Sequence, residues 1–443
     1  MKVRRLPVDP GPAAWNRLLP EADPPTVLDA ELTADWLVIG AGFAGLSAAH
    51  RLAELHGGDR IVVLDATRIG EGPAGRNSGF MIDLPHDLAS ADYTGAAAEN
   101  RTEIDDNRRG IAFAGAMAAT YGLSDEAFAL TGKINAAATP KGLAHNRSFA
   151  AHLAGLNEAH RMLDAAEMAD LTGTRYYLGG LFTPGTAMIQ PAMFVRAVAA
   201  GLVSNRVSIF ENSPVTALER NGDWVATTPG GRVAAPRVIL AVNGHLASFG
   251  IMSDRLVHVF TFASMTRALN GPEVAALGGS QMWGVTPADP MGTTVRRICG
   301  AGGDRIVVRN RFTVEPKMEV DPAQIAHAAR GHDRAFAARF PMLDGMDIEY
   351  RWGGRLCLSR NNVQVIGEVK PGLFAACCQN GLGTAKGTLA GLLAAELASG
   401  VSSPALDRAL ASPEPIRVPP GFITKPVGNA RTRWGEVRAG KEL

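Results

Sequence analysis

The chain has 443 residues, of which 46% are hydrophobic and 20% are charged. This composition allows a large buried core, excludes global disorder, and at this length suits two connected domains. The 44 basic and 43 acidic residues leave a net charge of +1, which favours neither nucleic acid nor an anionic membrane surface as a partner.

Targeting and metal-binding signals are absent from the sequence. The basic start, Met1 to Arg5, is followed by no apolar segment, and no run of eighteen apolar residues exists, so we expect neither a signal peptide nor a membrane span. The four cysteines, at positions 299, 357, 377 and 378, have no Cys-x-x-Cys spacing, which argues against a zinc ribbon and a disulfide reductase. So few cysteines suit a reducing compartment, and we predict a cytoplasmic protein without a metal site.

Residues 35–65 have the order of a dinucleotide-binding unit. An apolar strand at 35–39 runs into a G-x-G-x-x-G turn at 40–45, a helix with apolar residues at helical spacing, and a second strand at 61–64. Gly40 permits the tight turn, Gly42 lets a pyrophosphate approach the backbone, and Gly45 lets the helix pack closely. Asp65 ends the second strand, where it can accept hydrogen bonds from a ribose. This pattern alone does not separate NAD from FAD.

The loop at 66–80 favours FAD. Four glycines and Pro73 exclude a regular helix or strand, and bare backbone of this kind suits a loop lying against a planar ring or a phosphate. Arg76 is a candidate for neutralising phosphate, and Asn77 and Ser78 for hydrogen bonds to a flavin. A flexible surface loop is the alternative interpretation.

Residues 63–70 and 75–79 resemble the FAD loop of the D-amino-acid-oxidase-like flavoenzymes, a group that includes glycine, sarcosine and gamma-glutamylputrescine oxidases. The serine usual before Gly75 is Ala74 here. The resemblance implies an α/β fold: a Rossmann-like FAD-binding domain with an interleaved α+β substrate domain, whose antiparallel sheet lies over the flavin. It also implies that Val215 packs by the adenine and that the helix opening at residues 381–384 points at the flavin, where its positive dipole end stabilises negative charge.

The cofactor residues so assigned share glycine-rich turns, strand ends or one helix start. They are Gly40, Gly42, Phe43, Ala44, Gly45, Asp65, Ala66, Arg68, Gly75, Arg76, Asn77, Ser78, Val215, Asn243, Gly244, Gly354, Gly381, Leu382, Gly383 and Thr384.

The substrate side departs from the family. Leu356 stands where relatives carry an arginine that clamps the substrate carboxylate, and its neighbour Arg355 points to the other strand face. This favours an amine, or an amino acid bound by another group. His258 replaces a usual proline, and is either a substrate-side group or a buried core histidine. Lys386 lies one position beyond a family lysine. The catalytic candidates are therefore His258, Arg355 and Lys386.

Two further features stay open. Cys357 is offset from the cysteine that binds flavin covalently in the sarcosine oxidase branch, so we expect noncovalent FAD. Arg309 and Arg311 alternate on a predicted strand, so that both would share one face and meet either an acidic substrate or water.

The expected domains are discontinuous. Residues 1–90, 172–250 and 350–400 form the FAD-binding domain, 91–171 (expected as helical) and 251–349 the substrate domain, and 401–443 a surface tail. The expected activity is oxidation of a C–N bond in an amine or amino acid, with oxygen or a quinone as the electron acceptor. The alternatives are a non-catalytic or partner-dependent flavoprotein subunit and a flavin enzyme acting on another donor.

Overall fold

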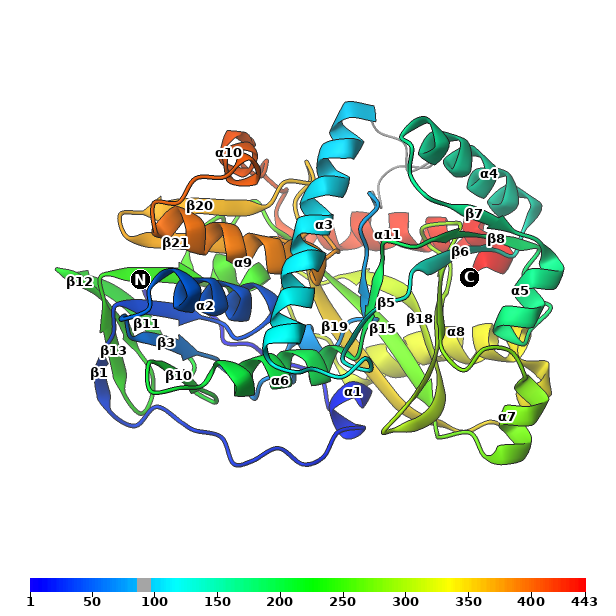
Figure 1. Ribbon diagram of the computed structural model, residues 1–443, viewed down its shortest axis with the longest axis horizontal. Helices are drawn as coiled ribbons and strands as arrows, with labels where there is room; N and C mark the ends of the chain where they lie inside the picture. The colour runs from blue at the N-terminus through cyan, green and yellow to red at the C-terminus, as the bar shows by residue number, and fades with distance from the viewer. Residues whose placement is uncertain (86–96) are drawn as a thin grey trace.

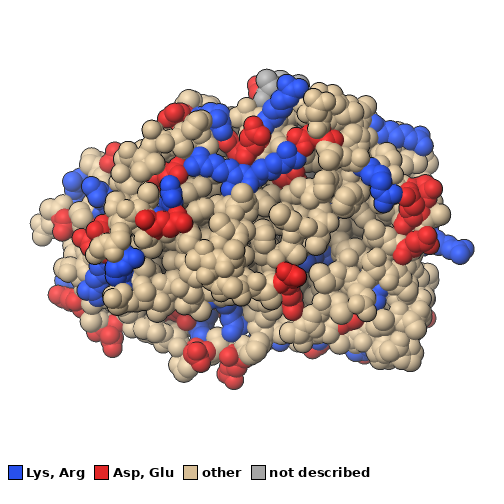
Figure 2. All heavy atoms as spheres, in the orientation of Figure 1, with Lys and Arg blue, Asp and Glu red and all other residues tan. Residues whose placement is uncertain are grey.

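The computed structural model describes residues 1–85 and 97–443 (Figure 1). The predicted boundary at residues 90 and 91 therefore lies outside the described part. Lys and Arg are interspersed with Asp and Glu over the face shown in Figure 2, which agrees with a net charge near zero.

A six-stranded sheet with the order β10-β3-β2-β14-β21-β20 forms the first half of the molecule. All neighbours pair in parallel except β20 and β21. The strands are β2 (Trp36–Ile39), β3 (Ile61–Leu64), β10 (Val207–Phe210), β14 (Arg237–Leu240), β20 (Val365–Lys370) and β21 (Leu373–Cys377). The central strands are continuous apolar runs because layers cover both faces of the sheet.

Alternate side chains of these strands enter two different cores. Val38 packs with helices α2 (Phe43–Leu55), α3 (Ala97–Thr120), α6 (Pro191–Leu202) and α9 (Ala385–Ala398). Leu37 packs on the opposite face with a four-stranded sheet, β1-β13-β12-β11. The strands of that sheet are β1 (Glu31–Thr33), β11 (Ala217–Asn221), β12 (Asp223–Thr227) and β13 (Arg232–Ala235). The result is the three-layered, Rossmann-like half that the sequence predicts.

An eight-stranded sheet, β19-β15-β18-β17-β16-β6-β8-β7, forms the second half. All its pairs are antiparallel except β16 with β6. The strands are β6 (Lys133–Ala137), β7 (Arg161–Leu163), β8 (Gly179–Thr183), β15 (Val257–Thr266), β16 (Trp283–Pro287), β17 (Thr294–Gly300), β18 (Gly303–Val314) and β19 (Ile348–Leu358). This sheet confirms the predicted antiparallel substrate-side sheet.

The remaining elements connect or cover the two sheets. They are α1 (Ala14–Arg17), α4 (Pro140–Gly155), α5 (Ala165–Thr172), α7 (Gly271–Leu277), α8 (Pro322–Arg339) and the small sheet of β4 (Phe80–Met81), β9 (Ala187–Ile189) and β5 (Phe128–Leu130).

Two strands lie on the other side of the expected domain boundaries. β8, and β19 apart from its first two residues, fall in ranges expected for the FAD-binding domain, yet they pair with β6 and β15 of the eight-stranded sheet. The range 91–171, expected as helical, also contains β5, β6 and β7. Strand membership depends on long-range pairing, which local apolar patterns do not encode.

The last 43 residues, expected as a surface tail, form the helices α10 (Pro404–Ala411) and α11 (Gly421–Ala439), many of whose residues are exposed. The segment is anchored at its end by a buried carboxylate. Glu442 is 3% exposed, and its Oε1 accepts hydrogen bonds from the backbone N–H groups of Ala138 and Thr139, each at 2.9 Å. The C-terminus therefore holds the start of α4 against the sheet.

Replacing Glu442 by alanine should lower the free energy of unfolding by about 1–3 kcal/mol, because the buried N–H groups of Ala138 and Thr139 lose their acceptor. Urea unfolding measures this loss. The matched control is Glu319→Ala, at an exposed position without a described ion pair, which should change the free energy by less than about 0.5 kcal/mol. Equal midpoints for the two variants would contradict the assignment.

Candidate FAD and substrate site

One elongated cavity is lined by both halves of the molecule. One wall carries the turn after β2, Asp65 after β3 and the start of α9. The opposite wall carries Thr286, Thr294 and Arg309 from the eight-stranded sheet. Residues predicted to bind the cofactor, the candidate cofactor cradle, and residues of the predicted substrate-side sheet, the candidate substrate wall, therefore line the same cavity.

The turn between β2 and α2 is shaped for a phosphate. Gly40 has a φ of +103°, and a Cβ there would lie 2.6 Å from the Ala241 carbonyl oxygen; one on Gly45 would lie 1.7 Å from that of Gly40. A Cβ on Gly42 would meet only the Ala74 Cβ, at 3.5 Å. No side chain caps α2 at Gly42, so its first N–H groups are open to an anion.

Asp65 is held beside this turn. Its Oδ2 accepts a hydrogen bond from the Ala41 N–H at 2.7 Å, and its Oδ1 accepts one from the Thr67 N–H at 2.9 Å. Burial raises the pKa of Asp65, while these hydrogen bonds lower it. Oδ1 also accepts a hydrogen bond from the Thr67 hydroxyl at 3.2 Å, so Oδ2 is the oxygen that keeps a lone pair for a ribose hydroxyl.

The start of α9 meets the other part of the cavity. Gly381 has a φ of +84°, and a Cβ on Gly383 would find no atom within 4 Å. Thr384 donates its hydroxyl to the Phe80 carbonyl oxygen at 2.6 Å, and no side chain caps the helix. The uncapped helix start suits the electron-rich edge of a flavin. Together the two helix starts and Asp65 fit FAD.

The predicted cofactor residues line this cavity, with the exception of Gly45, Gly75, Arg76 and Gly354. Gly75 instead permits a close turn, because a Cβ there would lie 1.8 Å from the Gly70 carbonyl oxygen. Gly354 lies against the backbone of Arg76. The side-chain NH2 group of Asn77 donates to the Ala74 carbonyl oxygen, and its Oδ1 accepts a hydrogen bond from the Gly79 N–H.

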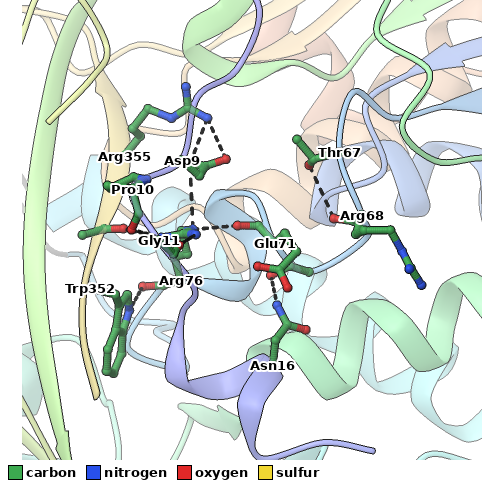
Figure 3. A network of polar contacts seen from close by, with 12 residues as sticks. Asp9, Pro10, Gly11, Asn16, Thr67, Arg68, Glu71, Arg76, Trp352 and Arg355 are labelled. Carbon is green, nitrogen blue, oxygen red and sulfur yellow. Dashed lines mark hydrogen bonds and ion pairs between the residues drawn. The ribbon is translucent and has the colours of Figure 1, made fainter. Parts of the chain in front are cut away.

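Arg76, predicted to neutralise phosphate, is not among the residues that line the cavity. Figure 3 shows its guanidinium among backbone carbonyl groups: it donates to the oxygens of Glu71 at 2.6 Å, Gly353 at 3.1 Å and Gly11. It is 4% exposed and lies 3.8 Å from the Asp9 carboxylate. Its donors are used to tie the N-terminal segment to the cofactor loop.

The three catalytic candidates occupy different surroundings. Arg355 lines the cavity, but it is paired with both Asp9 oxygens, at 3.1 and 3.2 Å, and with the His245 Nε2 at 2.6 Å. His258 also lines the cavity. Lys386 does not, because its Nζ pairs with Glu103 at 2.7 Å. The sequence-based prediction did not include His245 among the site residues, although it directly follows the predicted cofactor residues Asn243 and Gly244.

Arg309 is the charged side chain that β18 contributes to the cavity. Among the described residues no carboxylate or hydrogen-bond acceptor contacts its guanidinium, which lies 4.9 Å from the Phe312 ring centroid. Burial lowers the pKa of Arg309 to about 10, so the group stays cationic at neutral pH. Arg311 does not share this place: with a φ of +67° it turns away and pairs with Glu436.

Three histidines are expected to make the fold acid-sensitive: His332 is buried, and His245 and His258 are half-buried. Burial, chiefly, lowers the pKa of His245 to about 3, of His258 to about 4 and of His332 to about 3. Below pH 6.5 the unfolded chain therefore binds protons that the folded chain does not. Stability falls as the pH drops from 6.5 toward 4, by up to about 1.4 kcal/mol per pH unit for each histidine.

His332 isolates this effect because it lies outside the cavity, with its Nδ1 2.7 Å from the Ser264 hydroxyl. In His332→Gln the loss of stability between pH 6.5 and 5 should be smaller by about 1–2 kcal/mol. Urea unfolding at the two pH values measures the loss. A pH dependence of stability that is unchanged in His332→Gln would contradict the contribution assigned to His332.

Comparison with known proteins agrees with this geometry. The family described as DAO, FAD dependent oxidoreductase, matches residues 35–397, a span that contains the cofactor cradle and most of the substrate wall. The chain belongs to this family. It is therefore an FAD-dependent oxidoreductase.

Relatives within the DAO family match most of the chain. A probable oxidoreductase, OrdL, of Rhizobium meliloti is 23% identical and covers 90% of both chains. The gamma-glutamylputrescine oxidoreductase of Escherichia coli is 25% identical and covers 84% of this chain and 85% of its own. Glycine oxidase from Geobacillus kaustophilus has a similar structure, with a TM-score of 0.68 at 18% identity over 84% of this chain and 96% of its own.

Within 1–85 and 97–443, no helix is long and apolar enough to cross a bilayer, and no group of three His, Cys, Asp or Glu side chains is placed to hold a metal ion.

Proposed function

We propose that this DAO-family chain oxidises the C–N bond of an amine or amino acid that carries a carboxylate. When bound, FAD supplies the hydride acceptor, its N5 atom. The substrate is left as an imine, which water hydrolyses to a carbonyl compound and ammonia or an amine. The names of similar proteins support the reaction class, since they include gamma-glutamylputrescine oxidoreductase, glycine oxidase and L-proline dehydrogenase.

The surroundings of Arg309 are the observation that supports a carboxylate on the substrate. Arg309 is half-buried. Withdrawing a guanidinium from much of its water without a counter-charge is costly, and a substrate anion would supply the missing partner. A guanidinium also binds a carboxylate through two parallel hydrogen bonds, which fixes the substrate's orientation. Arg309 thus takes the role that Leu356 cannot fill. Arg355 is unsuited to it because Asp9 already neutralises its charge.

The neutral histidines shape the rest of the site. With pKa values of about 3 and 4, His245 and His258 are uncharged at neutral pH. Neutral imidazoles accept hydrogen bonds and do not repel a substrate nitrogen. We infer that Arg355, held by Asp9 and His245, positions this part of the wall, and that His258 is the candidate to contact substrate.

A second candidate is oxidation of a 2-hydroxy acid. The L-2-hydroxyglutarate dehydrogenase of Escherichia coli K12 is 25% identical over 225 residues, about half of each chain. A carboxylate on Arg309 would serve such a substrate equally well. The two candidates differ in the bond that is oxidised.

The electron acceptor is proposed to be oxygen or a quinone. A second cavity, of about 400 Å³, shares Arg5, His258 and Met318 with the main cavity, so an acceptor bound there would lie beside the candidate site. Hydrogen peroxide formation and the reduction of a soluble quinone, measured separately during turnover, distinguish the two.

Product analysis tests the proposal. Purified holoprotein is incubated with D- and L-amino acids, N-alkyl amino acids, carboxylated and uncarboxylated amines, and 2-hydroxy acids, and the carbonyl product and released ammonia or amine are quantified. Release of nitrogen in step with the carbonyl supports C–N oxidation. Turnover of 2-hydroxy acids alone supports the second candidate. No turnover by FAD-loaded protein would sink both and favour a partner-dependent flavoprotein subunit.

A further inference from the structure

The helix α11, the long red helix of Figure 1, turns its small and polar side toward the protein. A Cβ on Gly428 would lie 2.5 Å from the Val314 side chain, and one on Gly435 would lie 2.9 Å from that of Met291. Glu436 is 8% exposed and pairs with Arg311. The residues that hold α11 on β18 are therefore not the apolar ones that a surface helix normally buries.

The apolar residues of α11 face solvent instead. They share exposed fractions far above those of core residues: Phe422 79%, Ile423 43%, Val427 63%, Trp434 62% and Val437 75%. Ile423, Val427, Trp434 and Val437 are separated by four, seven and three residues, which places them on one stripe of the helix. An exposed stripe of this kind marks an interaction surface.

The charges around this stripe have one sign. Arg431, Arg433 and Arg438 are exposed, and none forms an ion pair with a carboxylate in the described ranges. The Arg438 guanidinium lies 4.6 Å from the Trp434 ring centroid, so the cation lies over the apolar stripe itself. The acidic residue of the helix, Glu436, is buried in its ion pair. The near-zero net charge of the whole chain conceals this local excess of positive charge.

We propose that α11 docks the protein onto an anionic lipid bilayer, lying in the plane of the interface. Aromatic and aliphatic side chains would enter the headgroup region, while the flanking arginines meet lipid phosphates and anionic headgroups. A second copy of the chain is a poorer occupant, because facing stripes would bring like charges together. The proposal is independent of the substrate and of the catalysed reaction.

Vesicle binding of the full-length holoprotein tests this docking. Sedimentation with phosphatidylcholine–phosphatidylglycerol vesicles should carry the protein down at low salt, and both added salt and pure phosphatidylcholine should release it. The double variant Val427→Glu, Val437→Glu should weaken binding by about tenfold or more. Leu130→Glu, at a 65% exposed site on β5, is the matched control and should bind as the parent does.

Tryptophan fluorescence locates the contact. Trp434 is 62% exposed, whereas the other five tryptophans are at most 7% exposed, so brominated anionic lipids should quench Trp434 selectively. Trp434→Phe should abolish the quenching while sedimentation persists.

Two results would overturn the proposal. One is a parent protein that does not bind anionic vesicles, or whose binding to them is unchanged in the double variant. The other is a parent protein that is dimeric by light scattering and becomes monomeric in that variant, which would assign the stripe to a second copy.

Discussion

Gly42→Val is expected to yield a folded chain that has lost its FAD. The glycine lies at the start of α2 with a φ of −87°, a conformation that valine adopts, and its Cβ position touches only Ala74. The added methyl groups would therefore occupy cavity space rather than strain the fold. That space is where a pyrophosphate must approach the helix N–H groups.

The FAD content of the purified Gly42→Val variant should fall by at least about tenfold, which corresponds to a loss of about 1.4 kcal/mol in binding. Flavin absorbance after denaturation, per mole of protein, measures it. Gly58→Val is the control, because a Cβ there meets no atom within 4 Å and the position does not line the cavity. Full FAD occupancy in Gly42→Val would show that the cofactor phosphates lie elsewhere.

Arg309→Met is expected to impair turnover without loss of FAD. If the guanidinium binds the substrate carboxylate, its removal should destabilise the transition state by about 2–5 kcal/mol. The value of kcat/KM should therefore fall at least about thirtyfold. The stability of the free enzyme should hold or rise, because a half-buried cation without a described counter-charge is replaced by an apolar side chain of similar length.

Two controls separate recognition from general damage in Arg309→Met. Arg309→Lys keeps the charge but loses the two-pronged geometry, so it should show an intermediate loss. An amine that lacks the carboxylate should react equally slowly with parent and variant. A kcat/KM that is unchanged for carboxylated substrates would remove Arg309 from the site.

The cofactor cradle was readable from the sequence because its requirements are local. Positions 40 and 45 require glycine because a Cβ at either would lie within 3 Å of a backbone atom. The strands on either side are continuous apolar runs. Asp65 follows its strand directly, so its place at the strand end needs no knowledge of distant contacts.

The roles of the arginines were not readable, because distant segments decide them. Arg76 lies in a loop typical of a cofactor site, but residues 9–11, more than sixty positions away, supply partners that occupy its donors. Strand alternation predicts one environment for Arg309 and Arg311. The register shift between β15 and β18 and the positive φ of Arg311 separate them.

The sequence also does not predict which side of α11 is buried. Its composition is that of a helix with an apolar stripe, which by itself predicts burial of that stripe. Only the structure shows that the glycines take the buried side. A cytoplasmic location, expected from the few cysteines, stays a prediction.

Anaerobic mixing of the FAD-loaded protein with single candidate substrates tests the central claim most directly, because it reads the reduction of the flavin without an acceptor. Flavin absorbance should bleach with an amine or amino acid that carries a carboxylate, and far more slowly with its decarboxylated counterpart. Flavin that stays oxidised with every nitrogen compound, or that bleaches only with 2-hydroxy acids, would contradict C–N oxidation.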